Sequence, residues 1–194
     1  MRSFGERHHL VDEMMPIYLR KSVRVGPLLR EYAPAMARWM TDPEVSENLG
    51  LRNKPSLERT SQWIEKALHD SAMRVFAISV DGQYVGNVVI DQINSYQGTG
   101  RLSVYVGESA ARGSRAGITG LYLAILQGFK EVGLRKIHLT VHPHNFRAIS
   151  CYVKLGFIVE GVLREEFLFR GERMAALYMG LLPRDFELVP AVWI

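Results

Sequence analysis

The clearest hydrophobic pattern in the chain runs from residue 118 to residue 132, where apolar side chains recur three and four positions apart. This period is typical of a helix with one buried face. Gly133 is expected to end the helix, because glycine readily adopts the left-handed conformation that closes a helical turn. The apolar positions are Ile118, Leu121, Tyr122, Ile125, Leu126, Phe129 and Val132.

A second pattern, in which apolar and polar residues alternate, predicts strands on both sides of this helix. Asp81-Gly82 lies between two of the alternating runs and predicts a hairpin turn. Another hairpin is expected around Arg170-Gly171-Glu172. The expected strands cover residues 22–28, 74–80, 84–90, 102–106, 136–142, 157–169 and 174–182.

Three further helices are expected. They cover residues 31–40, 56–69 and 146–155, with Ser56 as a candidate N-cap and Gly156 as a stop. Thr41-Asp42-Pro43 is expected to break the first of them, and residues 44–55 are expected to form a loop. The sequence therefore predicts an α+β domain with a single, mostly antiparallel mixed sheet and about four helices.

Length and composition narrow the class of protein. The chain has 194 residues, of which 47% are hydrophobic and 23% charged, as in an ordinary globular protein. We expect residues 22–186 to form one domain, preceded by an arm over residues 1–21 and followed by a tail over residues 187–194. No apolar run approaches the roughly 18 residues of a membrane span, and residues 1–21 do not resemble a secretory signal. The single cysteine, Cys151, favours a reducing cytoplasm.

The net charge of +4 is mildly basic and fits an anionic ligand. Nucleic acid is the weakest interpretation of this charge, because the basic residues are spread thinly among acidic ones. The residues that such binding would use are Arg20, Lys21, Arg24 and Arg30.

Residues 112–117 form a basic, glycine-containing loop that leads into the most regular helix of the chain. The start of a helix offers unpaired backbone N–H groups and the positive end of the helix dipole. Gly113 and Gly117 leave room for close approach of a ligand, and Arg112 and Arg115 supply forked donors for phosphate. The loop therefore predicts a phosphate site, with a solvated basic turn as the alternative. It contains neither a nucleotide P-loop nor a dinucleotide fingerprint.

A second group of candidate residues lies on the helix that begins at Asn145. Ala148 and Tyr152 follow Asn145 by three and seven positions, which places all three on one stripe. The amide of Asn145 and the hydroxyl of Tyr152 can then face one ligand, with small Ala148 between them. A separate stripe for the core is expected from Phe146, Ile149 and Val153. The alternative is that Asn145 is only an N-cap and Tyr152 only a core aromatic.

Together, the loop at residues 112–117 and the run from Asn145 to Gly156-Phe157 resemble the GCN5-related N-acetyltransferase (GNAT) superfamily. The stretch at residues 160–164 resembles the branch that contains ribosomal-protein N-terminal acetyltransferases and spermidine or amino-sugar N-acetyltransferases. The resemblance covers about residues 22–186. It implies a cytoplasmic enzyme that transfers an acetyl group from acetyl-CoA, the acyl-donor substrate, to a primary amine.

The resemblance also implies where the donor binds. Two central strands, at residues 102–106 and 136–141, are splayed, and the pantetheine arm enters between them. The pyrophosphate lies on the loop, and the Tyr152 hydroxyl reaches the sulfur. The implied donor-binding residues are Val104, Val106, Arg112, Gly113, Ser114, Arg115, Ala116, Gly117, Ile118, Thr119, Asn145, Ala148 and Tyr152, and no metal ion is expected.

The chemistry implied is direct attack of the amine on the thioester. An alkylamine has a pKa near 10.4, so it must lose a proton before it attacks. A strand amide near Val104 would stabilise the oxyanion. Tyr152 would protonate the leaving thiolate, which makes it the expected catalytic residue.

This chain departs from the family pattern at three positions. Arg115 stands where a loop glycine is usual, and it can either contact or crowd the phosphates. Arg101 and Thr140 stand where a catalytic glutamate is often found. The remaining candidates for the general base are Glu108, Asp91, His138 and His142. The histidines His138, His142 and His144 could also suggest a metal site, but a base role for one of them is the preferred interpretation.

The acceptor amine is left open by the sequence. A polyamine would favour a mouth lined by Asp42, Glu44, Glu47 and Asp91, whereas the nearby cations Arg52, Lys54 and Arg101 favour a nucleotide-linked amino sugar or an acidic protein N-terminus. A non-catalytic acyl-CoA-binding module on the same fold is the alternative function. Membrane and nucleic-acid partners are not expected, and a homodimer is allowed.

Overall fold

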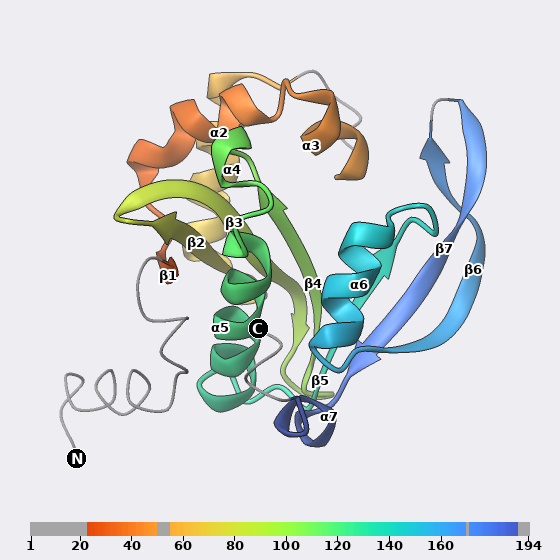
Figure 1. The fold of residues 1–194 in the computed structure, drawn as a ribbon. Coiled ribbons are helices and arrows are strands. Elements are labelled where there is room, and N and C mark those ends of the chain that lie inside the picture. Colours follow the sequence, from red (N-terminus) through yellow and green to blue (C-terminus); the bar gives the residue numbers. More distant parts are fainter. Residues whose placement is uncertain (1–22, 50–54, 170, 190–194) are drawn as a thin grey trace, which may run out of the picture.

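The computed structural model describes residues 23–49, 55–169 and 171–189. The expected arm at residues 1–21, residues 50–54 of the expected loop, Arg170 of the last turn and most of the tail lie outside the described residues. Figure 1 shows one curved sheet with helices on both of its faces.

Seven strands form this sheet in the order β1-β2-β3-β4-β5-β7-β6. Every neighbouring pair is antiparallel except β4 and β5, which are parallel. The predicted mixed and mostly antiparallel sheet is therefore confirmed. The strands are β1 (Val23–Pro27), β2 (Arg74–Val80), β3 (Gln83–Asn94), β4 (Thr99–Val106), β5 (Lys136–Val141), β6 (Ile158–Phe169) and β7 (Glu172–Leu181).

The parallel pair β4 and β5 separates soon after it begins. The two strands pair from Thr99 with Lys136 to Arg101 with His138, and the register stops there. Residues 102–106 of β4 and 139–141 of β5 then diverge, so the predicted splay is confirmed, although β5 parts from β4 later than residue 136. This opening is the feature around which the site is built.

The part of the chain that the structure describes holds six α-helices, two more than expected. The predicted helices are confirmed, and the hydroxyl of Ser56 caps α4 by accepting from the amide of Arg59 at 3.2 Å. Short 3-10 turns at Arg30–Tyr32 and Ser109–Ala111 precede α2 and α5. The α-helices are α2 (Ala33–Trp39), α3 (Pro43–Asn48), α4 (Leu57–His69), α5 (Ala116–Lys130), α6 (Phe146–Lys154) and α7 (Pro183–Glu187).

The expectation of a loop from residue 44 was wrong, because α3 occupies Pro43–Asn48. The Asp42 carboxylate accepts a hydrogen bond from the amide of Glu44 at 3.0 Å, which caps this helix. Pro43 occupies the first turn, where its missing N–H costs no helical hydrogen bond. Asp42-Pro43 therefore starts a new helix as well as ending the previous one. The helix α7 was missed for the same reason, since it too begins with a proline, Pro183.

Helices cover both faces of the sheet, each over its own hydrophobic core. On one face α5, α6 and α7 pack against the sheet, with Ile125 and Leu139 among the fully buried side chains. On the other face α2 and α4 pack together around Met36 and Ile64. In the described part of the chain, no helix has the length and apolar character to cross a membrane.

The predicted core stripe of α6 was partly wrong. Phe146 and Val153 are 76% and 56% exposed, whereas Tyr152 and Leu155 are buried in the main core. The inward face of α6 is the one that carries Ala148 and Tyr152, so the stripe assigned to the ligand also packs into the core. Tyr152 is therefore held in place by core packing.

Candidate active site

A cavity of about 360 Å³ opens where β4 and β5 diverge. Four segments enclose it, namely α3, the end of β4, the loop that leads into α5, and α6. Most residues predicted to bind the donor line this cavity. These residues are Val104, Val106, Arg112, Gly113, Arg115, Gly117, Ile118, Asn145, Ala148 and Tyr152.

Three predicted residues are not among those that line the cavity. Ser114 donates its hydroxyl hydrogen bond to the Ala111 carbonyl at 2.6 Å. Ala116 and Thr119 are buried at the start of α5, where they pack inward. Their side chains therefore shape the loop and the helix rather than the cavity surface.

The backbone of β4 offers donors to the gap. The Gly107 amide bonds to the Val85 carbonyl at 2.8 Å, and in an antiparallel pair such bonds fall on every second residue. Counting back along β4, the amides of Val104 and Val106 then face β5, where pairing has ceased. A narrow slot with free strand amides suits an extended chain that carries amide groups, as the pantetheine arm of a CoA does.

The loop into α5 has the conformation of an anion site. Gly113 and Arg115 both have positive φ, at +87° and +65°, and Arg115 is the N-cap residue of α5. The first amides of α5 carry the positive end of the helix dipole. Arg115 therefore adopts, with a side chain, the backbone conformation that a glycine takes most easily.

Two cations that sequence reasoning missed also line the cavity, Arg147 and Lys154 of α6. A Cβ at Gly113 would lie 3.7 Å from a terminal nitrogen of Arg147, so this guanidinium lies beside the loop. Arg147 and Lys154 are seven positions apart, which puts them on one face of α6. That spacing, next to the stripe of Asn145 and Tyr152, was the signal that could have found them.

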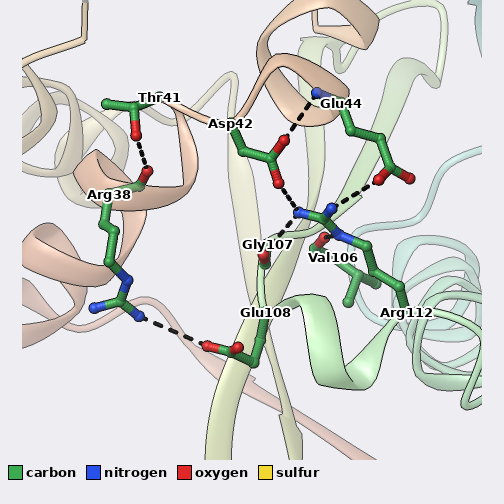
Figure 2. Close-up of polar contacts among 8 residues, drawn as sticks. All are labelled: Arg38, Thr41, Asp42, Glu44, Val106, Gly107, Glu108 and Arg112. Carbon is green, nitrogen blue, oxygen red and sulfur yellow. Dashed lines mark hydrogen bonds and ion pairs between the residues drawn. The ribbon is translucent and has the colours of Figure 1, made fainter.

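The guanidinium of Arg112 points toward Asp42 and Glu44 (Figure 2). Its guanidinium donates to Asp42 at 2.5 Å and to Glu44 at 2.8 Å, and it also donates to the carbonyls of Val106 at 3.1 Å and Gly107 at 2.9 Å. The Arg112 side chain is only 15% exposed. The hydrogen bond from Arg112 and the Glu44 amide hold the pKa of the Asp42 carboxyl below its ordinary value.

Tyr152 is placed by α6 against the floor of the cavity, beside Cys151. Its ring lies 5.6 Å from that of Phe157, and it is 7% exposed. Burial, and secondarily the neighbouring Cys151, raises the pKa of Tyr152 well above its ordinary value. The hydroxyl therefore stays protonated at neutral pH, as a proton donor requires.

Asn145 caps α6, because its side-chain oxygen accepts from the Ala148 amide at 3.1 Å. The cap orients the side chain at the wall of the cavity, since Asn145 and Ala148 both line it. The predicted N-cap is thus confirmed, and contact with a ligand stays a prediction.

None of the candidate bases lines the cavity. Asp91 is held by Arg101 through two hydrogen bonds, at 2.8 and 2.7 Å, and Glu108 lies 3.6 Å from Arg38. Burial lowers the pKa of His138 and of His142, so both side chains are neutral near pH 7. Within residues 23–49, 55–169 and 171–189, no three metal-ligating side chains gather in a cluster.

Comparison with known proteins agrees with this geometry. Residues 23–158 match the acetyltransferase (GNAT) domain family. The chain is 27% identical over 175 residues to the spermidine N(1)-acetyltransferase of Escherichia coli K12, covering 85% of this chain and 88% of the relative. It is 29% identical over 133 residues to the corresponding enzyme of Vibrio cholerae, covering 68% and 76%.

The fold is also that of solved acetyltransferases. The crystal structure of spermidine N-acetyltransferase from Vibrio cholerae in complex with CoA and spermine superposes with a TM-score of 0.79, at 22% identity, over 85% of this chain and 98% of that one. The family match spans most of the chain and includes the splayed strands, the loop and α6. The chain therefore belongs to the GNAT family of acetyltransferases, enzymes that transfer an acetyl group from acetyl-CoA to an amine.

Proposed function

We propose that the amine acceptor is a polyamine such as spermidine. The observation that carries this proposal is the wall that α3 presents to the cavity, which carries the Glu44 carboxylate. Asp42 caps α3 next to it, and both carboxylates pair with Arg112. A cationic chain is attracted to such a wall, and the relatives that match most of this chain are named for spermidine.

In this proposal acetyl-CoA supplies an activated thioester, and the protein positions it. The amides of Val104 and Val106 hold the arm in the gap, and an amide near Val104 stabilises the oxyanion. The loop from Gly113 to Gly117 faces the phosphates. Tyr152 then gives its proton to the departing thiolate, so that CoA leaves as the neutral thiol and the phenolate is reprotonated from water.

The amine must arrive at the thioester neutral. The candidate bases lie outside the cavity wall, so we propose that the ammonium proton leaves to water. A polyamine ammonium has a pKa near 10.4. Below that value its neutral fraction rises about tenfold for each unit by which the pH increases. Turnover at subsaturating acceptor should therefore rise steeply between pH 7 and pH 9.

The test is turnover with acetyl-CoA and a panel of amines, followed by mass spectrometry of the products. The panel contains spermidine, spermine, a glucosamine nucleotide and a peptide with a free N-terminus. We expect acetylated spermidine or spermine to form with the highest kcat/KM. Preference for the peptide or the amino sugar would overturn the polyamine proposal, and CoA binding without turnover of any amine would favour a non-catalytic module.

We further propose that the enzyme is a homodimer that assembles through the edge strand β6. Large apolar side chains are exposed on β6 and, separately, on α6, and β6 is an edge strand whose unpaired side could pair with a second copy. Light scattering after gel filtration should give twice the chain mass, and Val162→Lys should give a monomer. A monomeric wild-type protein would refute this. The exposed residues are Phe146, Val153, Ile158, Val159, Val162 and Leu168.

We propose that the protein is cytoplasmic. Its single cysteine, half-buried Cys151, has no disulfide partner within the chain, which suits a reducing compartment. Fractionation of cells that express the tagged chain would test this location.

A further inference from the structure

We propose that Arg112 is a positioning residue that fixes α3 as a wall of the active site, and that it is not a ligand of the CoA phosphates. The proposal rests on the acetyl-CoA site described above. It assigns to the first cation of the loop a role that the loop's basic character does not suggest.

The first support is the number of contacts that Arg112 makes within the protein. Four hydrogen bonds engage its guanidinium, two with carboxylates of the α3 segment and two with backbone carbonyls at the end of β4 (Figure 2). A guanidinium has five N–H donors, so one remains. One remaining N–H cannot hold a phosphate through two hydrogen bonds, so forked binding of a phosphate would require Arg112 to release one of these acceptors.

The second support is the position of the two carbonyls. The carbonyl of Val106 lies where β4 has lost its partner β5, and Arg112 takes over that acceptor. Gly107 carries the other carbonyl, and a side chain there would collide with the ring of Trp39 on α2. Arg112 therefore joins the end of β4 to the start of α3.

The third support is what α3 contributes to the cavity. Glu44, Val45 and Leu49 line it, opposite the loop and α6. Val45 is the one buried side chain among those that the structure describes in α3. With so little apolar anchoring, the ion pairs to Arg112 and the cap by Asp42 determine where this wall lies.

The discriminating experiment compares two donors, acetyl-CoA and S-acetylpantetheine, which carries the same thioester without phosphates. Arg112→Gln should weaken binding of both donors by the same factor, about tenfold, measured by calorimetry or by competition. A phosphate ligand would instead lose affinity for acetyl-CoA alone, and that result would overturn the proposal. Arg30→Gln removes a surface charge paired with Glu65 and is the matched control, with no expected effect on either donor.

A second variant keeps the test independent of folding. Asp42→Asn, at a more exposed partner, should reproduce the loss, and the double variant Arg112→Gln with Asp42→Asn should be no worse than either single change. The KM for the acceptor should rise in all three. A defect in folding alone would lower kcat per mole of protein with both KM values unchanged, and that outcome, or additive losses, would refute the positioning role. Because donor binding needs no acceptor, failure of the polyamine proposal would leave this test intact.

Discussion

The two short helices that flank the cavity, α3 and α6, are anchored by different forces. α6 is held by apolar packing, since Tyr152 and Leu155 belong to the main core. α3 is held by the carboxylates of Asp42 and Glu44 on Arg112. One wall of the site thus depends on shape and the other on charge.

This difference matches the work that each wall does in the proposed reaction. A hydroxyl that must reach one sulfur atom benefits from a rigid, packed helix, because small displacements are costly in catalysis. A wall that receives a flexible cationic acceptor can be set by ion pairs, which tolerate adjustment. Substitutions on α6 should therefore change kcat or stability, and substitutions around α3 should change KM.

The largest effect is expected for Leu155→Ala, at the C-cap of α6. Leu155 is fully buried, so its truncation leaves a cavity and should cost about 2–5 kcal/mol in the free energy of unfolding. Val45→Ala, the equivalent change on α3, removes less apolar surface and should cost about 1.5 kcal/mol. Urea denaturation of both variants measures the difference. Equal losses would mean that α3 is anchored by packing after all.

Tyr152→Phe should lower kcat about 100-fold, since it removes only the hydroxyl that donates the proton. The ring keeps its contact with Phe157, so CoA affinity should change little. Steady-state kinetics and calorimetry on the same preparation separate the two effects. Unaltered turnover in Tyr152→Phe would refute the acid role.

On the opposite wall, Glu44→Gln should raise the KM for the acceptor and leave kcat nearly unchanged.

Gly117→Asp places a carboxylate in the first turn of α5, between the two walls. Its Cβ would meet only Val106 at ordinary contact distance, so the change is electrostatic rather than steric. Repulsion from the CoA phosphates should weaken CoA binding about tenfold. Gly117→Asn is the neutral control of the same size. A dissociation constant that does not move would count against the loop as the phosphate site.

Arg115→Gly tests the departure of this chain from its family's loop. The backbone at Arg115 has φ of +65°, so glycine should stabilise the fold by about 0.5–1 kcal/mol through relief of strain. If the Arg115 side chain contacts phosphate, CoA binding should weaken at the same time. Thermal unfolding and calorimetry report the two effects separately, and tighter CoA binding would show that Arg115 crowds the ligand.

The smallest effect concerns pH and is confined to the charged wall. Arg112 lowers the pKa of the Asp42 carboxyl in the folded protein, so the unfolded chain binds that proton more readily. The resulting stabilisation is fully present above the ordinary value of 3.8 and is lost as pH falls through the lower folded value. The protection factors of the α3 amides, which correct for the pH dependence of intrinsic exchange, should therefore fall below pH 4 before those of α6 do. In Asp42→Asn that difference should vanish.

Local patterns predicted the helix from residue 118, the hairpins and the cap at Asn145, because each is a short-range property of the chain. Periodicity located α5, and Asp81-Gly82 located the first hairpin. Prediction failed for α3, where Asp42-Pro43 was taken only as a stop, although the same two residues also start a helix. It failed at Phe146 and Val153 because two adjacent stripes on a nine-residue helix differ by only one position.

The sequence by itself determined the class of the protein, the donor and most residues of the cavity, because strand, loop and capped helix are contiguous in the chain. Only the tertiary structure decided the role of Arg112. Its partners lie about seventy residues earlier, at Asp42 and Glu44, and no local pattern connects them to the loop. A basic residue in a sequence predicts attraction to any anion, but the fold determines which anion lies beside it. In this protein the carboxylates of α3 take that place, and Arg112 holds the wall that they form.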